Sequence, residues 1–324
     1  KILVTGVCGF IGFNLAKKFL EQNSNNIIYG IDNFDNYYSI ELKKNRLKIL
    51  KKFKNFIFDK VDIFKKKKIK AKLKNKKIDY VIHLAAQAGV RYSVENPKTY
   101  FINNLEVFFN ILETSKTNKI KHLIFASTSS VYGENTKFPL NEKDNTDNPI
   151  SFYAATKKSN EILAHSYSYI YKLPCTALRF FTVYGPFGRP DMALFKFTKN
   201  ILKNKKIELY NHGNHFRDFT YIADIIDGII PIIKQPKKNK IPFNIFNIGK
   251  GNSKKLITYL NSIEKKLNKK AKIKKLPMQL GDIKKTHSDI SLLKKNFGYA
   301  PTTDIDEGVS YFIDWYLEYY KIKL

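Results

Sequence analysis

Short apolar runs rich in β-branched residues alternate with longer stretches of helical periodicity through the first 180 residues of the chain. The short runs predict six strands, at Lys1–Thr5, Ile27–Ile31, Asn55–Val61, Tyr80–Leu84, Leu123–Ser127 and Cys175–Phe180. The stretches between them predict helices, including Gly12–Gln22, Ser39–Lys52, Tyr100–Ser115 and Phe152–Tyr171. Strands that alternate with helices are typical of a parallel sheet covered on both faces. We therefore predict an α/β fold built on a doubly wound parallel sheet.

The pattern changes after Gly185, where Pro and Gly punctuate shorter segments. Helices are predicted there at Met192–Asn200, Tyr221–Ile233, Lys254–Leu267 and Ile305–Tyr320. We interpret residues 1–180 as one domain and residues 181–324 as a smaller α+β domain, with some of its segments returning to pack on the first. The second domain is expected to close a cleft over the C-terminal edge of the sheet.

The charge of the chain raises the question of a polyanionic partner. The 324 residues are 43% hydrophobic, enough for a core, and carry 58 Lys and Arg against 28 Asp and Glu, a net charge of +30. Only five of these cations are arginines, the residue that binds phosphates and base edges bidentately. The lysines are densest between Lys43 and Lys77, without the interleaved aromatic residues of a single-strand-binding surface. We expect a solvated surface and no specific nucleic-acid partner.

The cysteine content and the hydropathy pattern exclude further classes of protein. Cys8 and Cys175 are too few for a disulfide framework or a structural zinc site, and no metal-ligand spacing is present, so we expect no metal. No apolar run approaches 18 residues, which excludes a membrane-spanning helix and any expected membrane partner. The first strand begins without an apolar leader, so the expected location is the cytoplasm.

A glycine-rich turn follows the first predicted strand. Gly6, Gly9 and Gly12 are spaced G-x-x-G-x-x-G, and with Phe10 and Ile11 they open the next helix. Such a turn lets backbone N–H groups and the helix dipole meet a diphosphate, as in Rossmann-type domains. Asp32 ends the next strand about 20 residues later, where a carboxylate binds an adenosine ribose and repels a 2′-phosphate. NAD is thus the expected cofactor, and the alternative is a plain glycine turn with a surface aspartate.

Two further patterns extend this site. Asp62, after the third strand, is placed to reach an adenine amino group, or serves as a surface or capping residue. Tyr153 and Lys157 are four residues apart on a predicted helix and share one face, and Thr128 follows the fifth strand. A nearby cation favours phenolate and lowers a tyrosine pKa from about 10 towards that of a general base. A single Y-x-x-x-K also occurs by chance in lysine-rich helices.

Together these features resemble the extended short-chain dehydrogenase/reductase family. The matching residues follow the order of the family: the glycine loop, Asp32, the stretch around Ala85, Thr128, and Tyr153 with Lys157. The resemblance implies an NAD-binding first domain in which Ala85 and Lys157 also contact the cofactor. It further implies that Thr128 hydrogen-bonds a sugar O4 and that Tyr153 is general base and then acid. Lys157 holds the nicotinamide ribose and tunes Tyr153, and two helices form a homodimer.

Longer strings in the chain resemble UDP-glucuronate 4-epimerases: HLAAQAGVRYS (83–93), RFFTVYGP (179–186), GRPDMA (188–193) and LPMQ (276–279). The resemblance implies interconversion of UDP-glucuronate and UDP-galacturonate through a 4-keto sugar, with a nucleotide-sugar-binding second domain. The residues expected to contact the UDP-sugar are Arg91, Thr182, Arg189, Arg217, Gln279 and Asp282.

Two of these arginines have specific expected roles. Arg189 offers a fork for the C5 carboxylate and, with Thr182, is expected to keep that carboxylate from leaving as CO2. Arg217 is expected to bind the diphosphate. The alternatives are an exposed loop arginine for Arg189 and a structural salt bridge with Asp218 for Arg217. Arg179, at a strand end, is interpreted as structural.

Several other functions stay open at this stage. Ser129 and Ser130 stand where related 4,6-dehydratases have an Asp-Glu pair, which argues against dehydration. A UDP-glucuronate decarboxylase, or an epimerase for UDP-glucose or an N-acetylated uronate, uses similar residues. A catalytically inactive member that binds nucleotide or RNA is the non-enzyme alternative, and the intact Tyr153 and Lys157 argue against it. His83 is expected to be a packed or hydrogen-bonded histidine.

Overall fold

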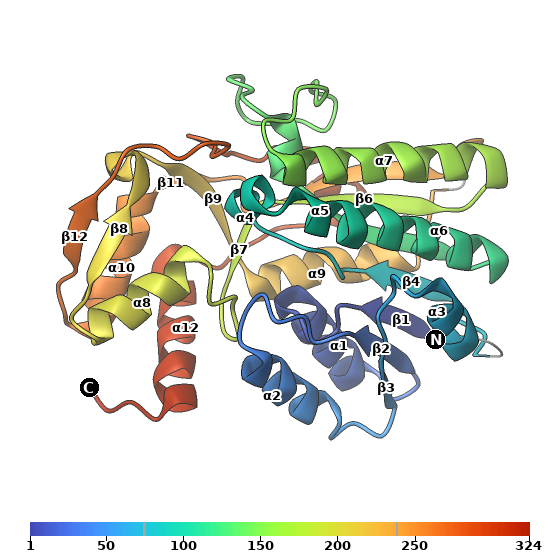
Figure 1. Ribbon diagram of the computed structural model, residues 1–324, viewed down its shortest axis with the longest axis horizontal. Coiled ribbons are helices and arrows are strands. Elements are labelled where there is room, and N and C mark those ends of the chain that lie inside the picture. Colours follow the sequence, from blue (N-terminus) through green and yellow to red (C-terminus); the bar gives the residue numbers. More distant parts are fainter. Residues whose placement is uncertain (74–75, 238) are drawn as a thin grey trace.

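The computed structural model describes residues 1–73, 76–237 and 239–324. Its centre is a seven-stranded parallel sheet in the order β10-β6-β5-β4-β1-β2-β3 (Figure 1). The strands are β1 (Ile2–Thr5), β2 (Ile28–Asp32), β3 (Phe56–Lys60), β4 (Tyr80–His83), β5 (His122–Thr128), β6 (Cys175–Phe180) and β10 (Phe243–Ile248). All six predicted strands are present in the sheet, and the predicted doubly wound α/β fold is confirmed. Lys74, within the lysine-rich stretch, lies outside the described residues.

The seventh strand, β10, comes from far along the chain and was not predicted. It pairs in parallel with β6, from Phe243 beside Cys175 to Ile248 beside Phe180. Its sequence, FNIFNI, carries Asn side chains between apolar ones, and Asn247 is fully buried. The Asn247 amide donates to the Leu140 carbonyl at 2.8 Å, so the polar side chain is satisfied inside the fold.

Helices cover both faces of the sheet. One face carries α1 (Phe10–Gln22), which packs against α2 (Ile40–Leu50) and α9 (Ile222–Ile233), and α11 (Ser291–Phe297), which packs on α9 and β10. The other face carries α3 (Lys66–Leu73), α6 (Val107–Thr117) and α7 (Phe152–Tyr171), with α6 between the other two. Each layer encloses its own apolar core against the sheet. The predicted helix Tyr221–Ile233 is therefore a segment of the second half that packs on the first.

A smaller module lies at one side of the sheet (Figure 1). It contains α8 (Ala193–Leu202), α10 (Leu256–Leu267) and α12 (Ile305–Tyr320), the pair β12 (Lys272–Lys275) and β8 (Lys206–Leu209), and the small sheet β11 (Ser253–Lys255), β9 (Phe216–Tyr221) and β7 (Thr182–Tyr184). Its core is rich in aromatic rings, and Phe219 stacks on Tyr259 at 4.2 Å between ring centroids. Phe312 and Tyr316 are buried there, so these C-terminal aromatics belong to the core.

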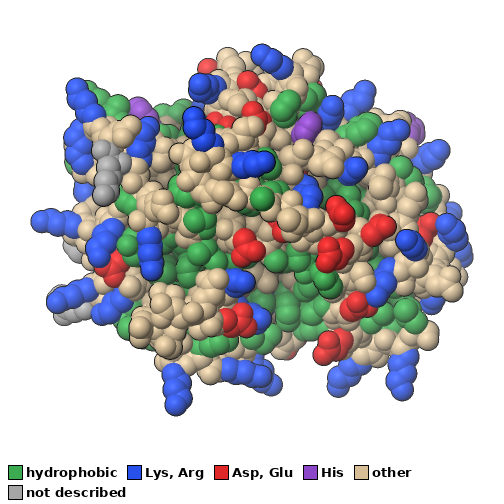
Figure 2. Space-filling model, turned by 180° about the vertical axis from the view of Figure 1, so that it is seen from behind, with side chains coloured by type: hydrophobic (Ala, Val, Ile, Leu, Met, Phe, Trp, Pro, Cys, Tyr) green, Lys and Arg blue, Asp and Glu red, His purple; other side chains and the backbone are tan. Residues whose placement is uncertain are grey.

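The surface charge is dispersed. On the face shown in Figure 2, Lys and Arg side chains lie around the whole outline, with acidic and apolar side chains between them. Among the described residues, none of the helices is both long and apolar enough to cross a membrane.

Candidate functional site

A cavity of about 290 Å³ opens at the carboxyl ends of the central strands, where ligands bind in open α/β sheets. It is lined by every residue for which a cofactor role was predicted, namely Gly6, Gly9, Phe10, Ile11, Gly12, Asp32, Asp62, Ala85 and Lys157. Thr128, Tyr153 and Arg189 line the same cavity. The first half of the chain and the start of the second thus meet in one site.

The glycine turn is shaped by backbone contacts that leave no room for side chains. The Gly9 N–H donates to the Gly6 carbonyl at 2.9 Å, and Gly6 has φ +67°. A Cβ on Gly6 would lie 2.8 Å from the backbone nitrogen of Ala85, and one on Gly12 would lie 2.3 Å from the Gly6 oxygen. The turn ends at Phe10, where α1 begins, so free N–H groups of the first helical turn face the cavity. This is a cradle for an anion.

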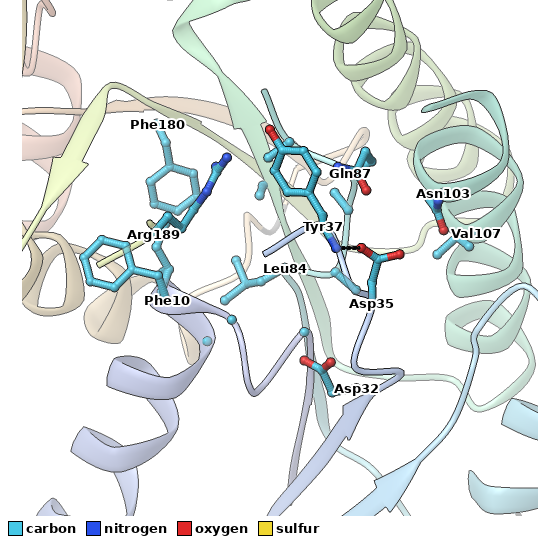
Figure 3. A pocket seen from close by; sticks show the side chains of 18 of the residues that line it. Phe10, Asp32, Asp35, Tyr37, Leu84, Gln87, Asn103, Val107, Phe180 and Arg189 are labelled. Carbon is cyan, nitrogen blue, oxygen red and sulfur yellow. Dashed lines mark hydrogen bonds between the residues drawn. The ribbon is translucent and has the colours of Figure 1, made fainter. Parts of the chain in front are cut away.

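Asp32 lies at the end of β2 and is 8% exposed. Its two carboxylate oxygens accept the N–H groups of Cys8 at 3.0 Å and Phe34 at 2.9 Å, which fixes the side chain beside the glycine turn. Figure 3 shows Asp32 apart from Arg189, which lies beside Phe180 and Phe10 in another part of the cavity. A carboxylate fixed at this edge suits the hydroxyls of a ribose.

Asp62 is half-buried in the cavity wall, and its Oδ1 accepts the Phe64 N–H at 3.1 Å. This contact is a local turn between residues 62 and 64, and Asp62 stands four residues before α3 begins at Lys66. Contact with an adenine remains a prediction, which the position of Asp62 in the wall allows.

Sequence reasoning missed several residues that line the cofactor part of the cavity. The Lys43 ammonium donates to the Asp35 carbonyl at 2.5 Å and lies 4.4 Å from the centre of the Tyr38 ring. Burial lowers the pKa of Lys43, against the opposing charges of Asp32 and Asp35. Lys43 is one of many lysines in its stretch, so no sequence signal distinguished it.

Gln87 was also missed. Asn104, in the π-helical segment Phe101–Glu106, accepts the Gln87 N–H at 2.8 Å and donates to its carbonyl at 3.0 Å. The Gln87 side-chain amide lines the cavity, and its Nε2 has no hydrogen-bond partner among the described residues. A buried donor without a partner costs free energy unless a ligand satisfies it. Together with the glycine cradle and Asp32, this orphan donor fits a dinucleotide.

The predicted catalytic residues lie together at the sheet edge. Thr128 ends β5, and Tyr153 and Lys157 lie on α7, whose first turn is capped by Ser151 through the Ala154 N–H at 3.2 Å. Burial raises the pKa of Tyr153, while a hydrogen bond with Thr128 and the charge of Arg189 lower it. The group that favours the phenolate most in this structure is Thr128, followed by Arg189.

Lys157 is fully buried, and burial lowers its pKa to about 8. Its ammonium donates to the Ala126 carbonyl at 3.1 Å. The predicted contact with a nicotinamide ribose and the predicted tuning of Tyr153 remain predictions. His83, close behind, shares a hydrogen bond of 2.8 Å with Thr5 Oγ1, and burial lowers its pKa to about 3. The interpretation of His83 as a packed, hydrogen-bonded residue is confirmed.

Arg189 enters the cavity from the loop before α8. Its guanidinium pairs with Asp191 through Nε to Oδ1 at 3.0 Å and Nη2 to Oδ2 at 2.5 Å. The Tyr37 hydroxyl donates to the same carboxylate at 3.4 Å. Arg189 is half-buried, which differs from an exposed loop arginine. Asp191 occupies one edge of the Arg189 guanidinium. The Arg189 side chain lines the cavity, and its remaining N–H groups can donate to a ligand there.

The other predicted substrate residues form a second cluster, centred on Asp282. Arg217 donates through Nη2 to Asp282 Oδ1 at 2.8 Å, and Arg91 Nη2 lies 4.0 Å from Asp282 Oδ2. His215, which the sequence analysis did not single out, places Nε2 3.4 Å from the same oxygen. The carboxylate partner of Arg217 in this structure is Asp282, not Asp218. Asp218 is instead fully buried and accepts the Ser288 hydroxyl at 2.6 Å.

The cluster carries unbalanced positive charge, because two arginines share one carboxylate. Burial lowers the pKa of Arg217 against the attraction of Asp282, and burial together with Arg217 lowers the pKa of His215. Gln279 Oε1 is buried there without a partner among the described residues. Thr182 lines a small cavity of about 30 Å³ together with Arg189 and Phe312. The structure thus brings together Arg91, Arg217, Gln279 and Asp282, and it places Thr182 beside Arg189.

Arg179 has the structural role expected of it. Its Nε and Nη2 donate to the two carboxylate oxygens of Glu161 at 2.9 and 2.8 Å, and both side chains are buried. Glu161 also accepts the Ser127 hydroxyl at 2.6 Å, so the pair fixes β5 and β6 to α7 close to the predicted catalytic residues.

Comparison with known proteins identifies the family to which the chain belongs. Residues 2–249 match the family model of the NAD dependent epimerase/dehydratase family. The chain is 40% identical to the probable UDP-glucuronate 4-epimerase of Rhizobium meliloti, over 99% of this chain and 98% of that protein. It is 43% identical to UDP-glucuronate 4-epimerase 4 of Arabidopsis thaliana, over 99% of this chain and 76% of that protein. The crystal structure of the UDP-glucuronic acid 4-epimerase of Bacillus cereus with UDP-glucuronic acid and NAD matches with TM-score 0.92 and 35% identity, over 98% of this chain and 99% of that one. The chain therefore belongs to the NAD dependent epimerase/dehydratase family.

Proposed function

We propose that this protein catalyses the NAD-dependent 4-epimerisation of UDP-glucuronate to UDP-galacturonate through a 4-keto sugar. The observation that carries the proposal is that Thr128, Tyr153 and Arg189 line the same cavity as the glycine turn. A phenol placed beside a hydroxyl suits a reacting sugar alcohol, and the arginine beside it suits a sugar that carries a carboxylate. Relatives and solved structures named UDP-glucuronate 4-epimerases support it.

Different residues of the cavity have different roles in the proposed reaction. Tyr153 takes the proton of the C4 hydroxyl and returns it to the ketone oxygen later, and Thr128 holds that oxygen by a hydrogen bond. The glycine turn, Asp32 and Gln87 would hold NAD, which would accept the hydride from C4 and later return it. The sugar must present its opposite face between the two transfers, so the rest of the substrate has to stay bound.

The Asp282 cluster is suited to that anchoring. Arg217 and Arg91 carry two positive charges, and Asp282 between them carries one negative charge. A bound diphosphate would supply the missing negative charge. Binding energy from the nucleotide, remote from C4, then holds the substrate while the sugar moves.

Arg189 is proposed to control the C5 carboxylate. A 4-keto uronate is a β-keto acid, which loses CO2 when the carboxylate bond aligns with the ketone. A charged hydrogen bond from Arg189 keeps the carboxylate away from that alignment. Thr182 lines a small cavity together with Arg189 and is proposed to assist in this role.

The test is incubation of the purified protein with UDP-glucuronate, first without and then with added NAD, and chromatography of the products with mass detection. Epimerisation gives an isomer of equal mass that co-elutes with UDP-galacturonate. A product lighter by CO2 makes the protein a decarboxylase, and turnover of UDP-glucose or an N-acetylated uronate alone changes the substrate. In Arg189→Ala we expect release of CO2; an unchanged product and KM would remove Arg189 from the proposal.

We also propose a homodimer located in the cytoplasm. Ile162, Tyr169 and Ile170 on α7 are 59%, 55% and 59% exposed, a run of apolar side chains that a second copy would cover. Both cysteines are free and buried, which suits a reducing compartment. Light scattering after gel filtration tests the dimer, and Ile162→Lys is expected to shift it towards monomer.

A further inference from the structure

Arg46, on α2, was not among the residues that the sequence suggested. It is fully buried, with a relative exposure of 0%. Its Nη1 donates to the Cys8 carbonyl at 2.7 Å and to the Tyr38 hydroxyl at 2.8 Å. Its Nη2 donates to the carbonyls of Phe187 at 2.5 Å and Gly188 at 3.4 Å. One guanidinium therefore joins the glycine turn to the loop that leads into Arg189.

The loop that leads into Arg189 contains two residues with positive φ and is held by contacts from several helices. Gly185 has φ +142° and Phe187, a residue with a side chain, has φ +59°. The Phe187 ring packs against Phe13 of α1 and Trp315 of α12, each at 4.9 Å between ring centroids. The loop is thus held by α1 and α12 through its ring and by α2 through its carbonyls, and Arg189 follows two residues later.

The charge of Arg46 is placed behind the anion cradle. The oxygens that accept its hydrogen bonds are carbonyls and a phenol, all uncharged. Cys8 lies in the turn between Gly6 and Gly9, and a hydrogen bond from a cation to its carbonyl holds that peptide in place. A dinucleotide diphosphate in the turn supplies a negative charge close to this buried cation.

We propose that Arg46 is a positioning residue that couples the dinucleotide site to the placement of Arg189. Because the guanidinium is planar and rigid, it fixes the distance and orientation of the Cys8 carbonyl on one side relative to the Phe187 carbonyl on the other. A shift of the glycine turn is passed to the Arg189 loop, and a loop fixed by substrate in turn holds the glycine turn. By reciprocity, NAD and the substrate carboxylate each strengthen binding of the other. The inference rests on the proposed function, because it uses Arg189 as the carboxylate ligand.

The test compares Arg46→Lys with the wild type and with Lys44→Met, an exposed position on the same helix that loses one positive charge without these contacts. Lysine keeps the charge but cannot donate in two directions from a plane. We expect the NAD Kd of Arg46→Lys to rise at least about tenfold. At saturating NAD we expect its KM for UDP-glucuronate to rise at least about tenfold, while the Ki of UDP, which has no carboxylate, changes less than about twofold. Lys44→Met should match the wild type in all three.

The outcomes separate the possibilities. The coupling is overturned if Arg46→Lys raises the NAD Kd but leaves the KM for UDP-glucuronate at saturating NAD at the wild-type value. It is also overturned if the Ki of UDP rises in parallel with that KM. No conversion of UDP-glucuronate by the wild type counts against the proposed function, whereas conversion with an unchanged KM in the variant overturns only the role of Arg46. If circular dichroism shows that Arg46→Lys does not fold, Tyr38→Phe removes one acceptor. It is expected to raise the same NAD Kd and KM about threefold, and no change in either overturns the inference.

Discussion

The dinucleotide cavity and the Asp282 cluster take their polar groups from different parts of the chain. The glycine turn of the cavity uses backbone N–H groups within seven consecutive residues, and contacts with Ala85 and Gly6 exclude side chains from it. The cluster uses side-chain charges from three distant segments, represented by Arg91, Arg217 and Asp282. The first site is therefore sensitive to any added atom, and the second to any change of charge.

The largest expected effect lies in the catalytic residues of the cavity. Tyr153→Phe removes the proton acceptor, and we expect kcat to fall by a factor of about 10³, with the Kd values of NAD and UDP unchanged within about twofold. Steady-state kinetics and calorimetry measure these values. Tyr167→Phe, on the same helix and bonded to Glu113, is the matched control and should keep full activity. A Tyr153→Phe enzyme with more than about a tenth of wild-type kcat would contradict the assignment of the base.

The next effect tests the backbone-built site. In Gly12→Ala the new methyl group meets the Gly6 carbonyl at 2.3 Å, so the turn must open. We expect the NAD Kd to rise about 100-fold, measured by fluorescence titration, with UDP affinity retained. Gly298→Ala is the control, since its Cβ meets nothing within 4 Å and only the positive φ is strained. Equal NAD affinity in Gly12→Ala and Gly298→Ala would show that the turn does not hold the cofactor.

The charge-built site is tested by its two arginines. Arg217→Met removes a partly buried cation and exposes the Asp282 charge to the substrate, so we expect the KM to rise about 30-fold with kcat changed much less. Arg91, whose side chain is 46% exposed, should contribute only about threefold in Arg91→Met. If the cause is charge, adding Asp282→Asn to Arg217→Met restores part of the loss. A double variant as weak as, or weaker than, Arg217→Met would refute that explanation.

The smallest expected effect is a pH dependence in the same cluster. Burial and Arg217 keep the pKa of His215 below 6.5, so the residue is neutral at pH 7.5. A bound diphosphate favours the charged form and raises that pKa, so the complex takes up protons as the pH falls. We therefore expect the Kd of the UDP-sugar to fall about threefold between pH 7.5 and pH 6. Titration calorimetry at several pH values measures this, and His215→Gln should abolish the trend; a trend that persists in His215→Gln assigns it to another group.

The contrast between the two sites also explains what the sequence could predict. The glycine turn, Asp32 and Thr128 lie at the ends of strands, and the topology of a parallel sheet brings strand ends to one edge. Tyr153 and Lys157 lie on α7, far along the chain from the end of β5. The common location of the glycine turn, Asp32 and Thr128 follows from this topology, whereas Tyr153 and Lys157 were assigned to the same site through their spacing and the family resemblance. The six strands of the first 180 residues were predicted from their short apolar runs.

Other residues depended on contacts that no local pattern reveals. Gln87 is positioned by Asn104 in a π-helical segment. Lys43 is one of many lysines in its stretch, and the buried contacts of Arg46 are made with residues as distant as Phe187. His215 acquires its place only when the loop that carries Asp282 folds over β9. The pairing of Arg189 with Asp191 was also missed, although only Pro190 stands between the two residues in the sequence.

The late position of β10 has a consequence for how the chain folds. Strand β6 is buried along its whole length, and one of its two hydrogen-bonding edges is satisfied only by residues 243–248. During synthesis that edge stays open while more than 60 further residues are added. An unpaired, apolar edge strand is a template for aggregation. A fragment cut after residue 180 would keep the glycine turn and the catalytic residues but would expose this edge, so we expect such a fragment to self-associate where the full chain does not.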